Sequence, residues 1–295
     1  MALLQTVTAA PPQPPPVRRS RRRRDPGRWI VLAFLGILAV GILLPLAVVV
    51  FNALKPAQEY ANSSPIALPH HLDLTNLREF WTRVDYGRKL WNSVLISGSV
   101  AVIAVLLSLF NAYALGIGKV RGRLALLVAF IGANILPQEV LVYPLYYLAK
   151  KLDLYDTRLS VIIIFSVIQT AFGTYLLAAV FAQFPRELLE AARLDGAGTW
   201  RTLWRVVVPI SRPTLAVLMV FFFVWTWNEF FIPLIFLLSN DNQTVSVALG
   251  VLQGQRLMDA TMSSASAVLG MIPTIVFFLI FQRTLSRGIT MGTIK

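Results

Sequence analysis

The chain has 295 residues, of which 56% are hydrophobic and only 14% are charged. A soluble domain carries roughly a quarter of charged residues, so this composition, with its apolar residues gathered in blocks, excludes an ordinary soluble protein and indicates an integral membrane protein. The sequence contains no cysteine, which excludes disulfides, thiolate metal sites and catalytic thiols.

The first 28 residues are proline-rich and basic. The run Pro11–Pro16 cannot form a helix or bury a core, which predicts disorder. A dense basic run from Arg18 to Arg24 follows and contributes to the net charge of +13. Such a run can bind nucleic-acid phosphates nonspecifically, but an apolar segment follows at once, and basic residues in that position anchor a membrane span on its cytoplasmic side. We therefore predict a disordered cytoplasmic tail over residues 1–28 and no nucleic-acid partner.

Six apolar stretches in the rest of the chain, residues 29–295, are long enough to cross a membrane. About 20 mostly apolar residues are needed, because every backbone polar group in lipid must bond within its own segment. The expected spans are Trp29–Leu54, Trp91–Ile117, Leu124–Leu148, Leu159–Phe181, Pro213–Leu238 and Ser264–Phe281. The sequence therefore predicts an all-α integral membrane protein whose six transmembrane helices form one bundle. Pro45, Pro137 and Pro144 lie inside expected spans and predict kinks.

The distribution of lysine and arginine predicts the orientation. With the N-terminus inside, the inner segments hold about twice as many of these residues as the outer segments, as the positive-inside rule requires. An even number of spans then places both termini in the cytoplasm, together with the loop between the fourth and fifth spans.

Several kinds of catalytic site are absent from the sequence. No G-x-x-x-x-G-K-[ST] phosphate-binding loop occurs, and the nearest string, GIGKVRG from Gly116, lacks its spacing and its hydroxyl. The only histidines, His70 and His71, lie in the first outer loop and are interpreted as solvated residues rather than metal ligands. No G-x-S-x-G nucleophile elbow occurs. We therefore predict that the chain is not an enzyme, binds no metal or cofactor, and does not hydrolyse ATP itself.

Few polar residues lie within the expected spans. Glu139 and Glu229 are ionisable, and such groups at membrane depth are costly and usually face a cavity or a partner helix. Trp227 and Asn228 stand beside Glu229, and an aromatic ring next to a polar side chain suits a sugar. These four residues predict a substrate path or a proton site. The alternative is that both glutamates reach water at the outer interface, where tryptophan is also common.

The loop of residues 184–212, between the fourth and fifth spans, has the pattern of two short helices. Pro185 and an acidic first turn at Glu187 favour the start of a helix. The sequence DGAG, Asp195–Gly198, breaks that helix, and Thr199 is expected to cap a second helix that begins at Trp200. An apolar stripe runs at three- and four-residue steps through Leu189, Ala192, Gly196, Trp200 and Leu203.

Two interpretations of this loop remain open from the residues alone. Its small residues leave a shallow surface that suits the groove of another protein. Alternatively, the loop lies on the lipid headgroups with its arginines facing the phosphates.

A spacing within this loop resembles the EAA signature of binding-protein-dependent ABC importer permeases, EAA-x3-G-x9-I-x-L-P. The matching residues are Glu190, Ala191, Ala192, Gly196, Val206, Val208 and Pro209, with valine in both aliphatic positions. Further strings make the chain from residue 29 onward similar to the carbohydrate-uptake permeases of the maltose type. These strings are WNSVLIS from Trp91, PLYYLAKKLDLYDT from Pro144, WTWNEFFIPL from Trp225 and the tail FQRTLSRGITMGTIK.

The resemblance implies that the loop forms a coupling helix seated in a cleft of a cytoplasmic ATPase. Glu190 would pair with a basic residue of the ATPase, and Gly196 would form the turn between the short helices. Ala191, Ala192, Asp195 and Pro209 would belong to the same coupling segment. The tail from about Arg287 would also touch the ATPase dimer.

The resemblance also implies a bacterial cell membrane location and a set of partners: a homologous permease, two ATPase subunits that carry the ATP and Mg²⁺, and an extracytoplasmic sugar-binding protein. The outer loop Ser239–Met262 would reach toward that binding protein. A neutral oligosaccharide or disaccharide is the expected cargo, because no arginine lies within the expected spans. The alternatives are a permease for another solute, such as glycerol phosphate, and a proton-coupled secondary transporter that uses Glu139 and Glu229.

Overall fold

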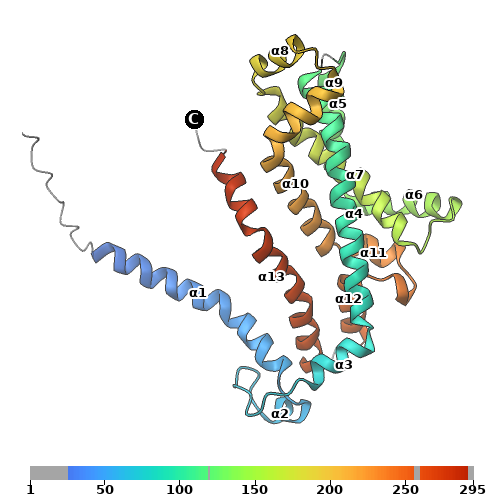
Figure 1. Ribbon diagram of the computed structural model, residues 1–295. Helices are drawn as coiled ribbons and strands as arrows, with labels where there is room; N and C mark the ends of the chain where they lie inside the picture. Colours follow the sequence, from blue (N-terminus) through green and yellow to red (C-terminus); the bar gives the residue numbers. More distant parts are fainter. Residues whose placement is uncertain (1–25, 119, 256–259, 292–295) are drawn as a thin grey trace, which may run out of the picture. The chain divides into compact units, whose positions relative to one another are not determined.

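The computed structural model describes residues 26–118, 120–255 and 260–291, and it divides into two compact units, residues 1–47 and 48–295, each of which is considered by itself (Figure 1). Helix α1 (Pro26–Ala53) begins in the first unit. Its segment Trp29–Ala53 has a mean hydropathy of 2.9, and the described side chains from residue 27 to 46 are exposed. Exposed apolar residues on all sides of a helix suit a hydrocarbon environment. The expected tail is therefore shorter than 28 residues, because the helix already begins at Pro26, and residues 1–25 lie outside the described part.

The second unit is built around three membrane-length helices. These are α4 (Tyr86–Ala112), which continues as the π-helical turn η1 (Tyr113–Ile117), α7 (Arg158–Ala182) and α10 (Val208–Asn228). Helix α4 packs most extensively against α7 and then against α10, and α13 (Ala260–Met291) packs on α10 (Figure 1). Between α1 and α4, the chain forms two short helices, α2 (Ala57–Asn62) and α3 (Thr75–Arg83).

Small residues allow these helices to approach closely. Ala101, Ala104 and Ala112 of α4 are buried in the same apolar cluster as Leu109 and Phe222. In a membrane the hydrophobic effect does not drive helices together, so close packing at small residues supplies much of the association. The sequence stretches that form the bundle are therefore apolar all round but small on the faces that meet.

The expected third span is wrong as a single helix. The structure breaks it into α5 (Arg123–Ile135) and α6 (Gln138–Lys151), which are bent by 95° relative to one another. The break falls at Pro137, which has no N–H for a helical hydrogen bond and forces the preceding Leu136 into an extended conformation. Within the described residues, five helices are long and apolar enough to cross a membrane, or six if the bent pair is one span.

The expected fifth span is wrong at its C-terminal end. Helix α10 ends at Asn228, Glu229 is extended, and a short helix α11 (Phe231–Phe236) follows. A continuous helix would need a bond from residue 233 to the carbonyl of Glu229, and Pro233 has no N–H to donate.

The expected outer loop Ser239–Met262 is largely helical. It contains the short 3-10 helix η3 (Asn240–Asn242) and helix α12 (Val245–Gln255), and α13 begins at Ala260. Residues 256–259 lie outside the described part, as does the chain beyond Met291. The expected sixth span, Ser264–Phe281, lies inside α13.

Candidate functional site

The loop of residues 184–212 forms two short helices, as the sequence predicts. Helix α8 (Arg186–Leu194) has Glu187 in its first turn and Arg193 in its last, which suits the helix dipole. Helix α9 (Thr199–Thr202) runs through the π-helical turn η2 (Leu203–Val207) into α10. The loop is thus rigidly continuous with a membrane-length helix.

The turn between α8 and α9 depends on Gly196. Its φ of +73° is in the left-handed region, which favours glycine. The N–H of Ala197 donates to the carbonyl of Ala192 (2.9 Å) and that of Gly196 to the carbonyl of Arg193 (3.0 Å). These two bonds form a Schellman cap, which satisfies the last carbonyls of α8.

The start of the second helix differs from the expectation. Gly198, rather than Thr199, is the N-terminal cap residue, and Thr199 is the first helical residue. The carbonyl of Thr199 instead accepts a hydrogen bond from the hydroxyl of Tyr113 at the end of the α4 span (3.1 Å). The extended conformation of Gly198 sets the direction of the chain, so no side-chain cap is needed.

The apolar stripe of the loop faces the protein only in part. Ala192 and Leu203 are buried, whereas Trp200 is 63% exposed and stacks on Phe110 of α4, with ring centroids 5.7 Å apart. Trp204 also contacts Phe110, at 6.4 Å. Exposed tryptophans at the end of a span are typical of the membrane–water interface, which places α9 beside the headgroup layer.

The residues of the EAA spacing divide between two environments. Ala192 is buried and Pro209 half-buried, so they hold the loop on the bundle, whereas Glu190, Ala191 and Asp195 are exposed. Glu190 lines a cavity of about 360 Å³ together with Arg123, Arg186 and Arg193. The sequence analysis did not single out Arg123, because it lies 67 residues before Glu190 and no local pattern joins them.

Trp227 and Asn228 lie in one cavity at the end of α10. It has a volume of about 480 Å³, and Ser246 and Thr274 from α12 and α13 also line it. The hydroxyl of Ser246 donates to the carbonyl of Trp227 (2.9 Å). Such a mixed lining, with an aromatic ring and several hydroxyl or amide groups, suits a polar, uncharged molecule.

The two candidate glutamates are not in this cavity. Glu229 lies at the break after α10, where its carboxylate accepts a hydrogen bond from the N–H of Phe231 (3.2 Å). Glu139 is exposed in the first turn of α6. Of the four candidate path residues, the structure therefore brings together two.

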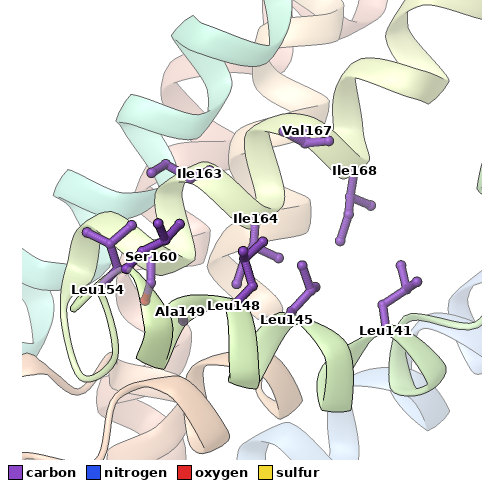
Figure 2. Close-up of a pocket in the computed structure, with 11 residues that line it drawn as sticks. Leu141, Leu145, Leu148, Ala149, Leu154, Ser160, Ile163, Ile164, Val167 and Ile168 are labelled. Carbon is purple, nitrogen blue, oxygen red and sulfur yellow. The ribbon is translucent and has the colours of Figure 1, made fainter.

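A second cavity, between α6 and α7, has a different chemistry. Leucines of α6 face isoleucines and a valine of α7 across a space of about 310 Å³ (Figure 2). Its one hydroxyl, Ser160, already donates to the carbonyl of Thr157 (2.7 Å). This cavity offers a sugar no free hydrogen-bonding partner, so it is not a candidate for the path.

A polar network between distant segments was missed by the sequence analysis. Lys89 of α4 is fully buried, and its ammonium donates to the backbone carbonyl of Asn240 and to Oδ1 of the same residue (2.9 Å). Asn92, one turn further on, donates to the carbonyls of Asp241 (2.8 Å) and Gln243 (3.0 Å). Two turns of α4 thus hold the segment of residues 239–243.

The loop before α7 holds the same segment from another side. The carboxylate of Asp156 accepts hydrogen bonds from the N–H of Ser239 (2.9 Å) and from its hydroxyl, and Asn242 donates to the carbonyl of Asp156 (2.6 Å). Partial burial raises the pKa of Asp156, but the bonds from Ser239 and Asn242 outweigh it and hold that pKa below its ordinary value of 3.8. We call residues 239–243 and the side chains of Lys89, Asn92, Asp156 and Arg158 the rim network, since Arg158 in turn donates to Asn92 (3.1 Å).

A family model, the binding-protein-dependent transport system inner membrane component, matches residues 105–291. The chain belongs to this family. A putative ABC transporter permease of Streptomyces antibioticus is 31% identical over 228 residues, which cover 77% of this chain and 100% of that protein. The diacetylchitobiose uptake permease of Streptomyces coelicolor is 26% identical, with 89% and 87% covered. The melibiose/raffinose/stachyose import permease of Bacillus subtilis is also 26% identical, with 92% and 98% covered.

A solved structure has the same fold. A bacterial ABC transporter involved in the import of the acidic polysaccharide alginate contains a chain that matches 88% of this permease and 97% of its own length, with a TM-score of 0.75 and 22% identity. This permease is therefore a multi-pass membrane subunit and not an enzyme, and the ATPase of such importers is a separate subunit.

Proposed function

We propose that this chain is a permease subunit of an ATP-driven importer for neutral oligosaccharides or disaccharides. Its relatives are named for diacetylchitobiose and for melibiose, raffinose and stachyose. Within the described residues, the cavity of Trp227 and Asn228 has no lysine or arginine in its lining, which favours an uncharged cargo over glycerol phosphate. A proton-coupled mechanism would need a relay, and Glu139 and Glu229 lie outside that cavity.

The observation that carries the proposal is the exposed face of α8. Glu190, Ala191 and Asp195 are exposed on a short helix that a Schellman cap ends and that buried Ala192 holds on the bundle. A short, shallow helix joined to a span can transmit a push from a partner's groove to the bundle. The partner is an ATPase subunit, which binds the ATP and Mg²⁺. The loop of residues 184–212 then faces the cytoplasm, with both termini on the same side.

The remaining partners follow from this arrangement. A homologous permease completes the path, and a second ATPase subunit completes the ATP sites. A chain like this one occurs in a complex with a periplasmic protein that holds an alginate pentasaccharide. An extracytoplasmic sugar-binding protein is therefore the partner at the other face of the membrane.

Replacement of Glu190 by alanine is expected to abolish uptake while the chain still inserts into the membrane. The side chain is exposed, so its removal leaves no hole in the bundle. The measurement is co-purification of the ATPase with the tagged permease, together with sugar uptake into cells. Glu187→Ala is the matched control, because Glu187 is exposed on the same helix and lies outside the EAA spacing. If the ATPase stays bound to the Glu190 variant and uptake continues without ATP, the proposal is wrong.

Gly196→Val is expected to reduce coupling through the backbone alone. No atom lies within 4 Å of the position that a Cβ would take, so a side chain meets open space, but the φ of +73° disfavours valine by roughly 1–2 kcal/mol. Gly198→Val is the control, because Gly198 also has open space and its φ is −68°. We expect ATP hydrolysis stimulated by the loaded binding protein to fall in the first variant and to persist in the second. Equal activity of the two variants would contradict a role for the turn.

A further inference from the structure

A basic cavity lies between α8 and the ends of three spans. Arg123 begins α5, and Arg186 and Arg193 lie near the two ends of α8, with Glu190 between them. Apolar side chains, among them Ile117 of η1 and Phe181 of α7, complete the lining. The cavity thus combines guanidinium groups with an apolar wall.

The charges of this cavity do not neutralise one another. Three guanidinium groups share it with one carboxylate, and no ion pair among the described residues joins Glu190 to Arg186 or Arg193. The cavity therefore has an excess of positive charge. Arginine binds the oxygens of a phosphate with two parallel hydrogen bonds, so a phosphate group is the ligand that such a cavity favours.

The cavity lies where the spans leave the hydrocarbon layer. Helix α7 ends at Ala182 and α5 begins at Arg123, and residues near both ends line the cavity. At the same end of α4, Phe110 stacks with the exposed ring of Trp200, an arrangement typical of the interface. Its inner wall is closed, because a Cβ on Gly116 would lie only 2.7 Å from Cβ of Phe181. A phosphate at this level has hydrocarbon on one side and water on the other.

We propose that this cavity binds the phosphate of an anionic phospholipid headgroup. Basic pockets between membrane helices on the cytoplasmic side bind such headgroups, and the apolar wall suits the first methylene groups of the acyl chains. A protein partner is the weaker fit, because the cavity lies on the side of α8 that faces the ends of the spans. Ala191 and Asp195, which are exposed on the same helix segment, do not line it. Glu190 shares the cavity and repels the phosphate, so its removal strengthens lipid binding.

The test uses the complete transporter in nanodiscs of phosphatidylcholine with one third phosphatidylglycerol. After transfer to a mild detergent, native mass spectrometry counts the phosphatidylglycerol that stays on the complex. The cavity variant Arg123→Gln/Arg186→Gln/Arg193→Gln is compared with Arg201→Gln/Arg205→Gln/Arg212→Gln, which removes the same charge from exposed residues of the same loop outside the cavity. A basic residue near an anionic surface accounts for roughly fivefold in affinity, so retention falls at least about tenfold in the cavity variant and stays within about twofold in the control.

The remaining arms separate the proposal from its rivals and from the coupling role of α8. Glu190→Ala increases retained phosphatidylglycerol, whatever it does to the ATPase, because the readout is lipid and not transport. Should the cavity variant fail to assemble, Arg123→Gln alone is expected to lower retention about fivefold. Equal losses in both triple variants would mean a general charge effect and overturn the proposal. It is also overturned if the cavity variant loses the ATPase but keeps its lipid, or if inorganic phosphate displaces the lipid.

Discussion

Gly173→Ala is expected to destabilise the bundle, whereas Gly98→Ala is expected to stabilise it slightly. Gly173 lies in α7 where α4 and α10 meet it, and a Cβ there would overlap Oγ of Ser108 and lie 2.8 Å from Cβ of Ser108 and 2.9 Å from Cζ of Phe222. Ser108 and Phe222 are fully buried, so neither can swing into solvent. Overpacking of a dense core costs about 1–3 kcal/mol, and the helices must separate to admit the methyl group.

The control has the opposite sign for a stated reason. No atom lies within 4 Å of the position that a Cβ on Gly98 of α4 would take. Alanine is a better helix former than glycine by roughly 1 kcal/mol, and nothing opposes that gain at this position. Thermal unfolding of the assembled transporter in detergent measures both, with an expected fall of several degrees for Gly173→Ala, since 1 kcal/mol corresponds to about 2–4 °C in a domain of this size. A small effect of Gly173→Ala would show that α4 and α7 are less closely packed than described.

The apolar blocks of the sequence predict the membrane-length helices well, because a span is specified locally. The expected fourth span, Leu159–Phe181, differs from α7 by one residue at each end. Hydrophobicity over about 20 residues is enough for such a prediction, since lipid requires every backbone group to bond within its own segment. The turn at Gly196 was predictable for the same reason: its cause, glycine in a left-handed conformation, lies within the turn itself.

The breaks were harder to predict, although their causes are visible in the sequence. Pro144 lies inside α6 without ending it, whereas Pro137 marks a bend of 95°. A proline removes the same N–H in both places, and the outcome depends on whether neighbouring groups satisfy the carbonyl that is left free. That information is tertiary. The same limit explains why the sequence did not show that Trp227 and Asn228, but not Glu139, share a cavity.

The rim network was beyond sequence reasoning altogether. Lys89 and Asn240 are 151 residues apart, and neither stands in a recognisable pattern. The sequence showed Lys89 only as one cation of an outer segment, where a solvated side chain is the ordinary outcome. Its complete burial is a property of the folded bundle, and it makes Lys89 the polar residue of the rim on which a substitution acts most strongly.

Lys89→Met is expected to release residues 239–243 and to lower the stability of the transporter. Methionine has nearly the same length but cannot donate a hydrogen bond, so the carbonyl and Oδ1 of Asn240 lose their donor. Because Lys89 is fully buried, water cannot replace it. Hydrogen bonds to charged groups contribute about 1.5–3 kcal/mol each, although part of that gain only offsets the desolvation of the ammonium.

Arg88→Met is the matched control for this prediction. Arg88 precedes Lys89 and pairs with Asp85 (3.3 Å) and Asp241, but its side chain is 48% exposed. Exposed ion pairs contribute about 0–1 kcal/mol, so this variant is expected to unfold within about 2–4 °C of the wild type. The two variants remove one charge each from adjacent residues that contact the same segment, and they differ in burial.

Limited proteolysis at residues 239–243, followed by mass spectrometry, measures the release directly, and thermal unfolding measures its cost. Faster cleavage in Lys89→Met than in Arg88→Met is the expected result. A Lys89→Met transporter as stable as the wild type would mean that desolvation of the buried ammonium cancels its hydrogen bonds. In that case Asn92 and Asp156 would be sufficient to hold the segment, and the buried cation would contribute to its position rather than to its stability.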